Sequence, residues 1–246
     1  YILHCHGSDV RDRTVLTRPL TRQALSHARY VFYATPDLRQ FLSDARADAE
    51  FLPNPIDLER FSPSTPAGDA RDVFLCSALT EIKGAATTLE ACRLLAARRP
   101  DIRITAYAGG EFAPEFDKLP TVTLIAHQPR WKIPEIVNRH AVISGQVKVG
   151  AAGMAELEAM ACGRPVITWF NHPGAYPEEP PFINASSAPV MADAIERLID
   201  DSTARETAGA AGRAWIEKYH ALDRIAARVE AVARAIVDGR PVPPAD

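Results

Sequence analysis

Long apolar runs, paired cysteines and an excess of charge are all missing from this sequence of 246 residues. No apolar run approaches the ~18 residues that a membrane-spanning helix needs, and the first residues lack the pattern of a signal peptide. The formal net charge of −3 argues against a nucleic-acid partner, because a nucleic-acid-binding surface is strongly basic. No internal repeat or low-complexity block interrupts the chain.

The cysteines are few and scattered, and none forms a CxxC pair. They are Cys5, Cys76, Cys92 and Cys162. Such spacing is typical of small buried thiols in a reduced compartment and not of a disulfide or zinc framework. We therefore expect a cytoplasmic protein without a structural metal.

Short apolar runs rich in β-branched residues are the first recurring feature of the chain. Seven of them predict strands: Tyr1–Cys5, Tyr30–Tyr33, Asp72–Ser77, Ile102–Tyr107, Val122–Ala126, Ala141–Ser144 and Pro165–Trp169. Helical stretches are predicted near 18–28, 36–43, 84–98, 132–139 and 153–162, then at Val190–Ile199, Ser202–Tyr219 and Leu222–Val237. Strands that alternate with helices indicate βαβ units, so the predicted fold class is α/β with parallel, doubly wound sheets.

Proline marks the clearest boundary between domains. Four prolines fall within Pro53–Pro66, and they favour extended backbone over a long helix. We interpret 1–53 as a partial first lobe, because about 52 residues are too few for an independent domain of this kind. The remaining divisions are a linker at 54–66, a second domain at 67–220, a C-terminal helix at 221–238 that packs back on the first lobe, and a tail at 239–246.

Small residues precede the helix predicted at 153–162. The loop from Gly150 to Gly153 follows a strand, and such a loop exposes the amides and dipole of a helix N-terminus to an anion, commonly phosphate. On a helical projection Glu156 falls on the solvated side, whereas Glu158 lies about 40° from Met154, at the edge of the apolar stripe. A partly desolvated carboxylate there needs a partner. The residues alone leave two interpretations open, a nucleoside diphosphate site and a tight turn with a surface glutamate.

The run from Glu158 to Ile167 reads EAMACGRPVI, and it resembles the EAMACGxPVI signature of the family 4 glycosyltransferases. These are retaining enzymes of the GT-B fold, with two Rossmann-like lobes. The resemblance implies that Glu158 holds the donor ribose and that Gly153, Met154 and Ala155 meet the diphosphate. It extends from about His6 to Ile199, and it implies that the chain lacks the start of the acceptor-side lobe.

One position departs from the family pattern. The family carries E-x7-E, whose first glutamate meets the transferred sugar, and Gly150 stands at that position here. A subset of the family has Gln-x-x-x-Gly-x-x-Gly instead, which Gln146, Gly150 and Gly153 match. The resemblance therefore implies a catalytic role for Gln146.

The sequence places Lys83 in the opening turn of the helix predicted near 84–98, where the helix dipole disfavours a lysine unless an anion is near. The lysine is either solvated or a clamp for a diphosphate. Family members carry a Lys-Gly pair at this position that holds donor phosphate, and here it is Lys83 with Gly84. They often have an arginine where this sequence has Ala78, so that phosphate contact is either lost or supplied by Arg130 or an arginine of the first lobe.

Two histidines complete the expected site. His6, in the sequence His6-Gly7-Ser8-Asp9, resembles the HGxD-type turn in which a histidine lies near the donor sugar, which implies a catalytic role. His4 and His6 share a strand face, so a metal pair or packed strand histidines remain alternatives. His127 and Gln128 follow another strand, at the loop where the family places the nucleobase. They are either neighbours of the base or part of a polar surface loop. Arginines of the first lobe either form a solvated face or approach a membrane or an anionic acceptor.

The resemblance implies transfer of a sugar from a UDP-sugar or GDP-sugar to an acceptor hydroxyl with retention, without a metal ion. The acceptor stays open among glycans, lipid-linked molecules and small molecules, and contact with the inner face of a membrane stays open too. Two other enzymes of this fold remain as alternatives, a nucleotide-sugar epimerase and a phosphorylase. A non-catalytic nucleotide-sugar-binding module is the alternative outside enzymes.

Overall fold

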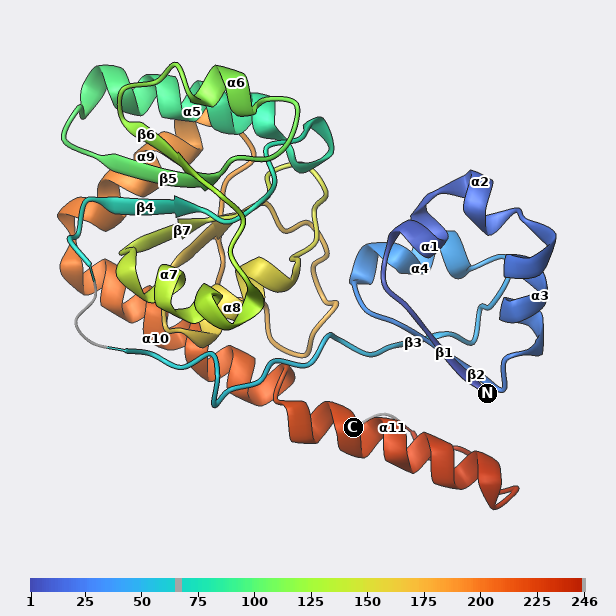
Figure 1. Ribbon diagram of the computed structural model, residues 1–246. Coiled ribbons are helices and arrows are strands. Elements are labelled where there is room, and N and C mark those ends of the chain that lie inside the picture. Colours follow the sequence, from blue (N-terminus) through green and yellow to red (C-terminus); the bar gives the residue numbers. More distant parts are fainter. Residues whose placement is uncertain (65–67, 245–246) are drawn as a thin grey trace. The chain divides into compact units, whose positions relative to one another are not determined.

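The computed structural model describes residues 1–64 and 68–244, and the chain forms two compact units (Figure 1). Unit 1 consists of Tyr1–Pro55 and Tyr219–Asp246, and unit 2 of Ile56–Lys218. The chain therefore passes between the units twice. Residues 65 and 66 of the predicted linker, the predicted domain start at 67 and the last two residues of the predicted tail lie outside the described residues.

Unit 1 contains a parallel three-stranded sheet in the order β1-β2-β3. The strands are β1 (Ile2–Cys5), β2 (Tyr30–Tyr33) and β3 (Glu50–Phe51). Its helices are α1 (Ser8–Arg11), α2 (Arg13–Leu16), α3 (Pro19–His27), the 3-10 turn η1 (Pro36–Leu38), α4 (Arg39–Leu42) and α11 (Leu222–Val237). Side chains alternate across a strand, so Val31 and Tyr33 face a core with Leu25 and Leu42, while Phe32 faces the other way.

The C-terminal helix α11 covers the second face of this sheet. Its Ile225 and Val232 are buried against Phe32 and Leu52. An ion pair adds to this contact, because Arg228 donates to both carboxylate oxygens of Glu50, at 2.8 and 2.5 Å. The last helix of the chain is therefore part of the core of unit 1.

His220 connects the two segments of unit 1 at the points where the chain leaves this unit and returns to it. Its side chain is buried, and its Nδ1 lies 2.8 Å from the carbonyl oxygen of Asn54. Burial lowers the pKa of His220 to about 4, since a charged imidazole is disfavoured away from water.

The stability of the protein is expected to depend on this histidine at acid pH. The pKa of His220 is lower in the folded than in the unfolded state, so its contribution is fully present above about pH 6.5. It is lost as the pH falls toward 4, because the unfolded chain then binds the proton more tightly. Between pH 6.5 and 4 the wild type should lose about 3 kcal/mol more than His220→Gln, measured by urea unfolding at several pH values. Parallel pH curves for the two proteins would contradict this.

Unit 2 contains a parallel six-stranded sheet in the order β6-β5-β4-β7-β8-β9. The strands are β4 (Asp72–Leu75), β5 (Arg103–Tyr107), β6 (Val122–Ile125), β7 (Val142–Ser144), β8 (Val166–Thr168) and β9 (Ile183–Asn184). In sequence order this is 3-2-1-4-5-6, the order of a doubly wound nucleotide-binding sheet. All seven strands predicted from the sequence are present, and β3 and β9, with two residues each, are additional.

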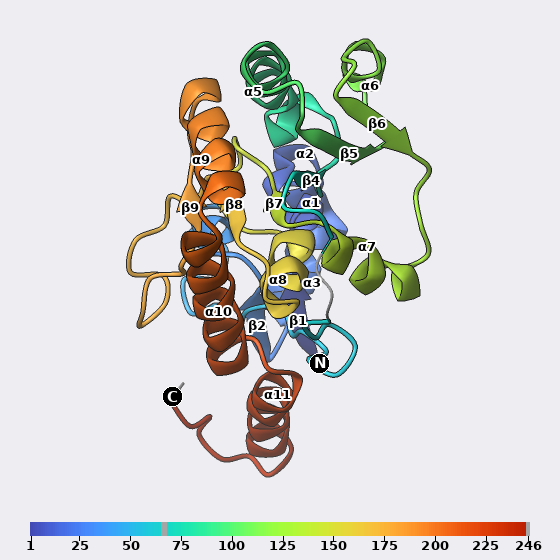
Figure 2. The same ribbon diagram turned by 90° about the vertical axis from the view of Figure 1, so that its left-hand side faces the viewer.

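Helices cover both faces of the six-stranded sheet. They are η2 (Glu81–Lys83), α5 (Ala85–Arg98), α6 (Ala113–Phe116), η3 (Arg130–Lys132), α7 (Ile133–Arg139), α8 (Met154–Ala161), α9 (Ala188–Asp200) and α10 (Ser202–Tyr219). Helices α5 and α9 pack on the face of Val73 and Leu75. Helices α7 and α8 cover the opposite face, as Figure 2 shows. The sequence prediction of an α/β fold is confirmed.

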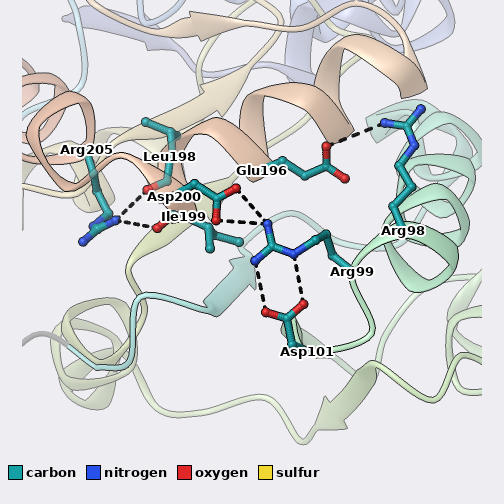
Figure 3. A network of polar contacts seen from close by, with 8 residues as sticks. All are labelled: Arg98, Arg99, Asp101, Glu196, Leu198, Ile199, Asp200 and Arg205. Carbon is teal, nitrogen blue, oxygen red and sulfur yellow. Dashed lines mark hydrogen bonds and ion pairs between the residues drawn. The ribbon is translucent and has the colours of Figure 1, made fainter.

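A polar network joins the ends of α5, α9 and α10 (Figure 3). Arg99 pairs with both Asp101 and Asp200. Arg205 donates to the carbonyl oxygens of Leu198 and Ile199 at the end of α9. Carbonyl groups at a helix C-terminus have no partner inside the helix. Arg205 supplies one at the end of α9, and Arg99 ties that end to the loop between α5 and β5.

Within the described part of the chain, no helix is both long and apolar enough to span a membrane.

Candidate functional site: the loops after β4 and β7

Two loops meet where the strand order of the unit 2 sheet reverses. Strands β4 and β7 are neighbours there, and open α/β sheets bind ligands at the carboxyl ends of such strands. The loop after β4 carries Lys83 and the loop after β7 runs from Gly145 to Gly153. The amide of Val147 donates to the carbonyl oxygen of Lys83 at 3.0 Å, so the two loops are in direct contact.

The contact between the loops requires a glycine at position 84. Gly84 has a φ of 81°, and a Cβ built there would lie 2.8 Å from Cγ2 of Val147. A side chain would therefore be strained by the backbone and would meet the second loop. Gly84 keeps Lys83 close to the loop after β7.

Gln146 organises the loop after β7 from the inside. Its side chain is buried, its Nε2 donates to the carbonyl oxygens of Ala151 and Trp169, and its Oε1 accepts from the amides of Lys148 and Val149. All four hydrogen bonds are formed within the protein, which fills the capacity of the side chain. The catalytic role expected for Gln146 stays a prediction, and these contacts support a role in shaping the loop.

Glu156 is buried, and the prediction that it lies on the solvated side of the helix is wrong. It is 2% exposed, and its carboxylate accepts from the amides of Gln146 and Gly153 and from the Ser77 hydroxyl. The helical projection misplaced it because it considered the helix alone, whereas the preceding loop folds over the first turn. A glutamate three residues after a helix N-cap is a capping signal, and this spacing could have identified Glu156.

The N-terminus of α8 is open to a ligand. Gly153 is its N-cap and has no side chain to cap the helix, while the Glu156 carboxylate accepts from the amide of Gly153 itself. The amides of Met154 and Ala155 lie in the first turn, where no intrahelical partner exists. They can therefore donate to an anion, which the helix dipole also favours.

Gly150 has a backbone conformation that glycine favours. Its φ is 79°, and a Cβ there would make only ordinary contacts with Trp169 and Asn171. The backbone, not crowding, thus explains why a glycine rather than a glutamate occupies this position.

Lys83 is the last residue of the turn η2 and precedes α5, which begins at Ala85. The sequence places it in the opening turn of this helix, and the structure places it just before the helix. Its ammonium group forms no hydrogen bond or ion pair with any residue that the structure describes, whereas nearby Lys148 pairs with Glu81. A cation without a partner beside the loop after β7 is suited to an anionic ligand.

Glu158 lies on α8, one turn beyond the uncapped amides, and is 4% exposed. Its Oε1 accepts from Nη2 of Arg130 at 2.5 Å. Burial raises the pKa of Glu158, and the charges of Arg130 and Arg60 oppose this rise. The sequence-based expectation that this carboxylate is desolvated and has a partner is confirmed.

Tyr107 and His127 stack on each other beside Glu158. Their ring centroids are 4.7 Å apart and the rings are inclined by 14°. The Tyr107 hydroxyl is buried and has no hydrogen-bond partner among the described residues. Burial raises the pKa of Tyr107, and the nearby Cys76 and Glu158 add to this rise. Sequence analysis included His127 but missed Tyr107, although an aromatic residue at the end of a strand that carries a site is a usable signal.

His6 belongs to unit 1 and follows β1. Its ring lies 4.3 Å from that of His4, between centroids, and its amide donates to Asp9 at 3.0 Å. The imidazole of His4 lies 3.1 Å from the carbonyl oxygen of Leu52. His4 is thus a packed strand histidine, and Asp9 caps the turn. The role of His6 stays a prediction.

Among residues 1–64 and 68–244, no group of three or more histidine, cysteine, aspartate or glutamate side chains could hold a metal ion.

The unit 2 domain matches a protein-family model. This model, described as glycosyl transferases group 1, matches residues 70–201, which is more than half of the chain. The match covers both loops of the site and all of α8.

A curated protein of Corynebacterium glutamicum is also similar. It is a GDP-mannose-dependent monoacylated alpha-(1-6)-phosphatidylinositol monomannoside mannosyltransferase, 28% identical over 211 residues. The alignment covers 73% of this chain and 55% of that protein. The chain therefore spans about half the length of this relative.

Two solved structures show the same fold. Anabaena Alr3699/HepE in complex with UDP and glucose has a TM-score of 0.75 at 15% identity, covering 95% of this chain and 71% of that one. Staphylococcus aureus TarM, in complex with fondaparinux, alpha-GlcNAc-glycerol and UDP, has a TM-score of 0.70 at 15% identity, covering 85% and 44%. The parallel-sheet α/β architecture with C-terminal helices is thus that of GT-B glycosyltransferases. By the match of its unit 2 domain, this chain belongs to the glycosyl transferases group 1 family.

Proposed function

We propose that this chain binds a nucleoside diphosphate sugar at the loops after β4 and β7 and transfers the sugar to an acceptor hydroxyl with retention. The family 4 subtype of the glycosyltransferases, suggested by the EAMACGRPVI run, is part of this proposal. The observation that supports it most is the buried Glu158 carboxylate one turn beyond the uncapped amides of α8. These two features offer an acceptor for ribose hydroxyls and donors for a diphosphate at a suitable separation, ~6 Å along the helix axis.

The proposed chemistry uses charge that the protein already holds in place. The bond between the anomeric carbon and the diphosphate oxygen breaks, and negative charge grows on that oxygen. Lys83 and the amides of Met154 and Ala155 are placed to stabilise this charge, and such preorganised groups are the usual source of rate enhancement. The bond from the anomeric carbon to the acceptor oxygen forms in the same transfer, and the proton of the acceptor hydroxyl passes to the departing diphosphate oxygen. In this proposal the reaction needs no metal ion.

The donor proposed for the first test is GDP-mannose, because the Corynebacterium relative is GDP-mannose-dependent. UDP-glucose is the second, because Alr3699/HepE was solved with UDP and glucose. The stacked rings of Tyr107 and His127 are proposed to lie beside the base. Acceptors are screened in three classes, namely glycans, lipid-linked molecules and small molecules.

The substitution Glu158→Gln tests the binding site directly. It keeps the size of the side chain and removes its charge, and a hydrogen bond to a charged acceptor is stronger than one to a neutral acceptor. We expect GDP or UDP to bind about tenfold more weakly by isothermal titration calorimetry. Glu135→Gln, an exposed change on α7, should leave binding within a factor of about two.

A non-catalytic binding module is the second candidate, because Ala78 and Gly150 stand where family members carry functional side chains. A turnover assay distinguishes such a module from a transferase. A transferase releases nucleoside diphosphate from the sugar donor in the presence of an acceptor, whereas a binding module does not. An epimerase would change the donor sugar without releasing the diphosphate. If the wild-type chain binds neither GDP nor UDP at millimolar concentration, the proposed function is wrong.

A further inference from the structure

We propose that Arg130 is a positioning residue for the donor ribose, which keeps the Glu158 carboxylate oriented and charged and does not contact the donor phosphates. This inference rests on the proposed function, since it concerns how the same site recognises its donor. It differs from the expectation that Arg130 replaces the phosphate contact missing at Ala78.

The two carboxylate oxygens of Glu158 differ in their hydrogen bonds. Nη2 of Arg130 lies 2.5 Å from Oε1 of Glu158, and no residue that the structure describes donates a hydrogen bond to Oε2. One oxygen is thus fixed by the arginine while the other keeps its acceptor capacity. A carboxylate held in this way is ready to accept from a ribose hydroxyl without first reorganising.

Arg130 is itself held by the protein. Its guanidinium carbon lies 5.9 Å from the centroid of the Phe61 ring, and Phe61 is 1% exposed. The backbone of Phe61 is fixed in turn, because Arg213 donates to its carbonyl oxygen at 2.7 Å. An aromatic face attracts a guanidinium group, so Phe61 and Glu158 together define where Arg130 points.

Position along α8 argues against a phosphate contact. Glu158 is four residues beyond Met154, which is about 6 Å along the helix axis from the first free amide. Arg130 is thus paired with a residue one helical turn beyond the amides that are proposed to meet the diphosphate. Lys83 is better suited to the phosphate contact, because its ammonium group has no partner among the residues that the structure describes.

The charged groups around Glu158 show how Arg130 affects the pKa of this carboxyl. Burial is the main cause that raises the pKa of Glu158, and Arg130 is the largest influence that lowers it. The other groups with charge interactions at Glu158 are Arg60, which lowers its pKa, Glu156, which raises it, and the titratable side chains Cys76, Tyr107 and Cys162. Removal of Arg130 would therefore raise the pKa of Glu158 further and favour its protonated form, which is a poorer acceptor.

The test compares a ribonucleotide with its analogue that lacks both ribose hydroxyls. The affinities of GDP and 2′,3′-dideoxy-GDP, or of the UDP pair if the wild type binds UDP better, are measured by calorimetry at pH 6.5 and 8.5. The wild type should prefer the ribonucleotide by about thirtyfold at both values. Arg130→Met should reduce this preference to about threefold at pH 6.5. The loss should be smaller at pH 8.5, because a higher pH favours the ionised form of a carboxyl.

Two control variants distinguish a positioning role of Arg130 from a general effect of positive charge on nucleotide binding. Lys132→Met removes the same charge from the same turn, where Lys132 lies over the Trp131 ring, and it should keep the preference. Arg130→Lys retains the charge and should keep most of the preference for the ribonucleotide. If Arg130→Met weakens both nucleotides equally, or weakens neither, the positioning role is wrong while donor binding stands. If the wild type binds neither nucleotide, the proposed function itself fails.

Discussion

Replacement of Lys83 by methionine is expected to lower kcat about 100- to 1000-fold, the effect of removing one donor that stabilises charge growing in the transition state. The side chain keeps a similar length and loses only its charge, so the contact of its backbone carbonyl with Val147 remains. The measurement is the rate at which nucleoside diphosphate is released from the nucleotide sugar. Binding of the free diphosphate should weaken as well, by about tenfold.

Lys148→Met is the matched control for Lys83. Lys148 lies in the adjoining loop, and its ammonium group already pairs with Glu81. An exposed pair of this kind contributes little, so its loss should change kcat less than about twofold. Equal effects of the two substitutions would show that the local positive potential matters and not the position of Lys83.

Glu156→Ala is expected to reduce the free energy of unfolding of the protein by about 4 kcal/mol, because a buried carboxylate that accepts three hydrogen bonds is removed. The amide of Gln146 would be left buried without its acceptor, and the loop after β7 would lose its attachment to α8. Urea unfolding followed by tryptophan fluorescence measures this, since all three tryptophans belong to unit 2.

Glu90→Ala on α5 is the control for Glu156. Its carboxylate is exposed and pairs only with Arg93 at 3.5 Å, so the substitution should change the free energy of unfolding by less than about 0.5 kcal/mol. A small effect of Glu156→Ala would mean that water or another group replaces the carboxylate as the acceptor in the loop.

Periodic parts of the fold could be predicted from the sequence. Five of the six strands of the unit 2 sheet are short apolar runs separated by helical stretches, so their presence and parallel direction follow from local pattern and connection rules. The strands β3 and β9 could not be predicted, because each has two residues and forms only through pairing with β2 and β8.

Site residues could be predicted where a single segment of sequence determines their burial. They could not be predicted where burial or a contact depends on two segments that meet only in the folded protein. Glu158 stands at the edge of an apolar stripe, so its burial follows from the helix alone. Glu156 and Gln146 are buried because the loop folds back on α8, and no periodicity in either segment shows this. Arg130 meets Glu158 across 28 positions of sequence, a contact that only the fold creates.

The placement of α11 on unit 1 has a consequence for synthesis of the protein. The residues that complete the second face of the β1-β2-β3 sheet leave the ribosome after all of unit 2. Unit 2 ends at Lys218, so it can fold while Phe32 and Leu52 are still uncovered. A nascent chain arrested before α11 should therefore expose apolar surface of unit 1, far in sequence from the point of arrest.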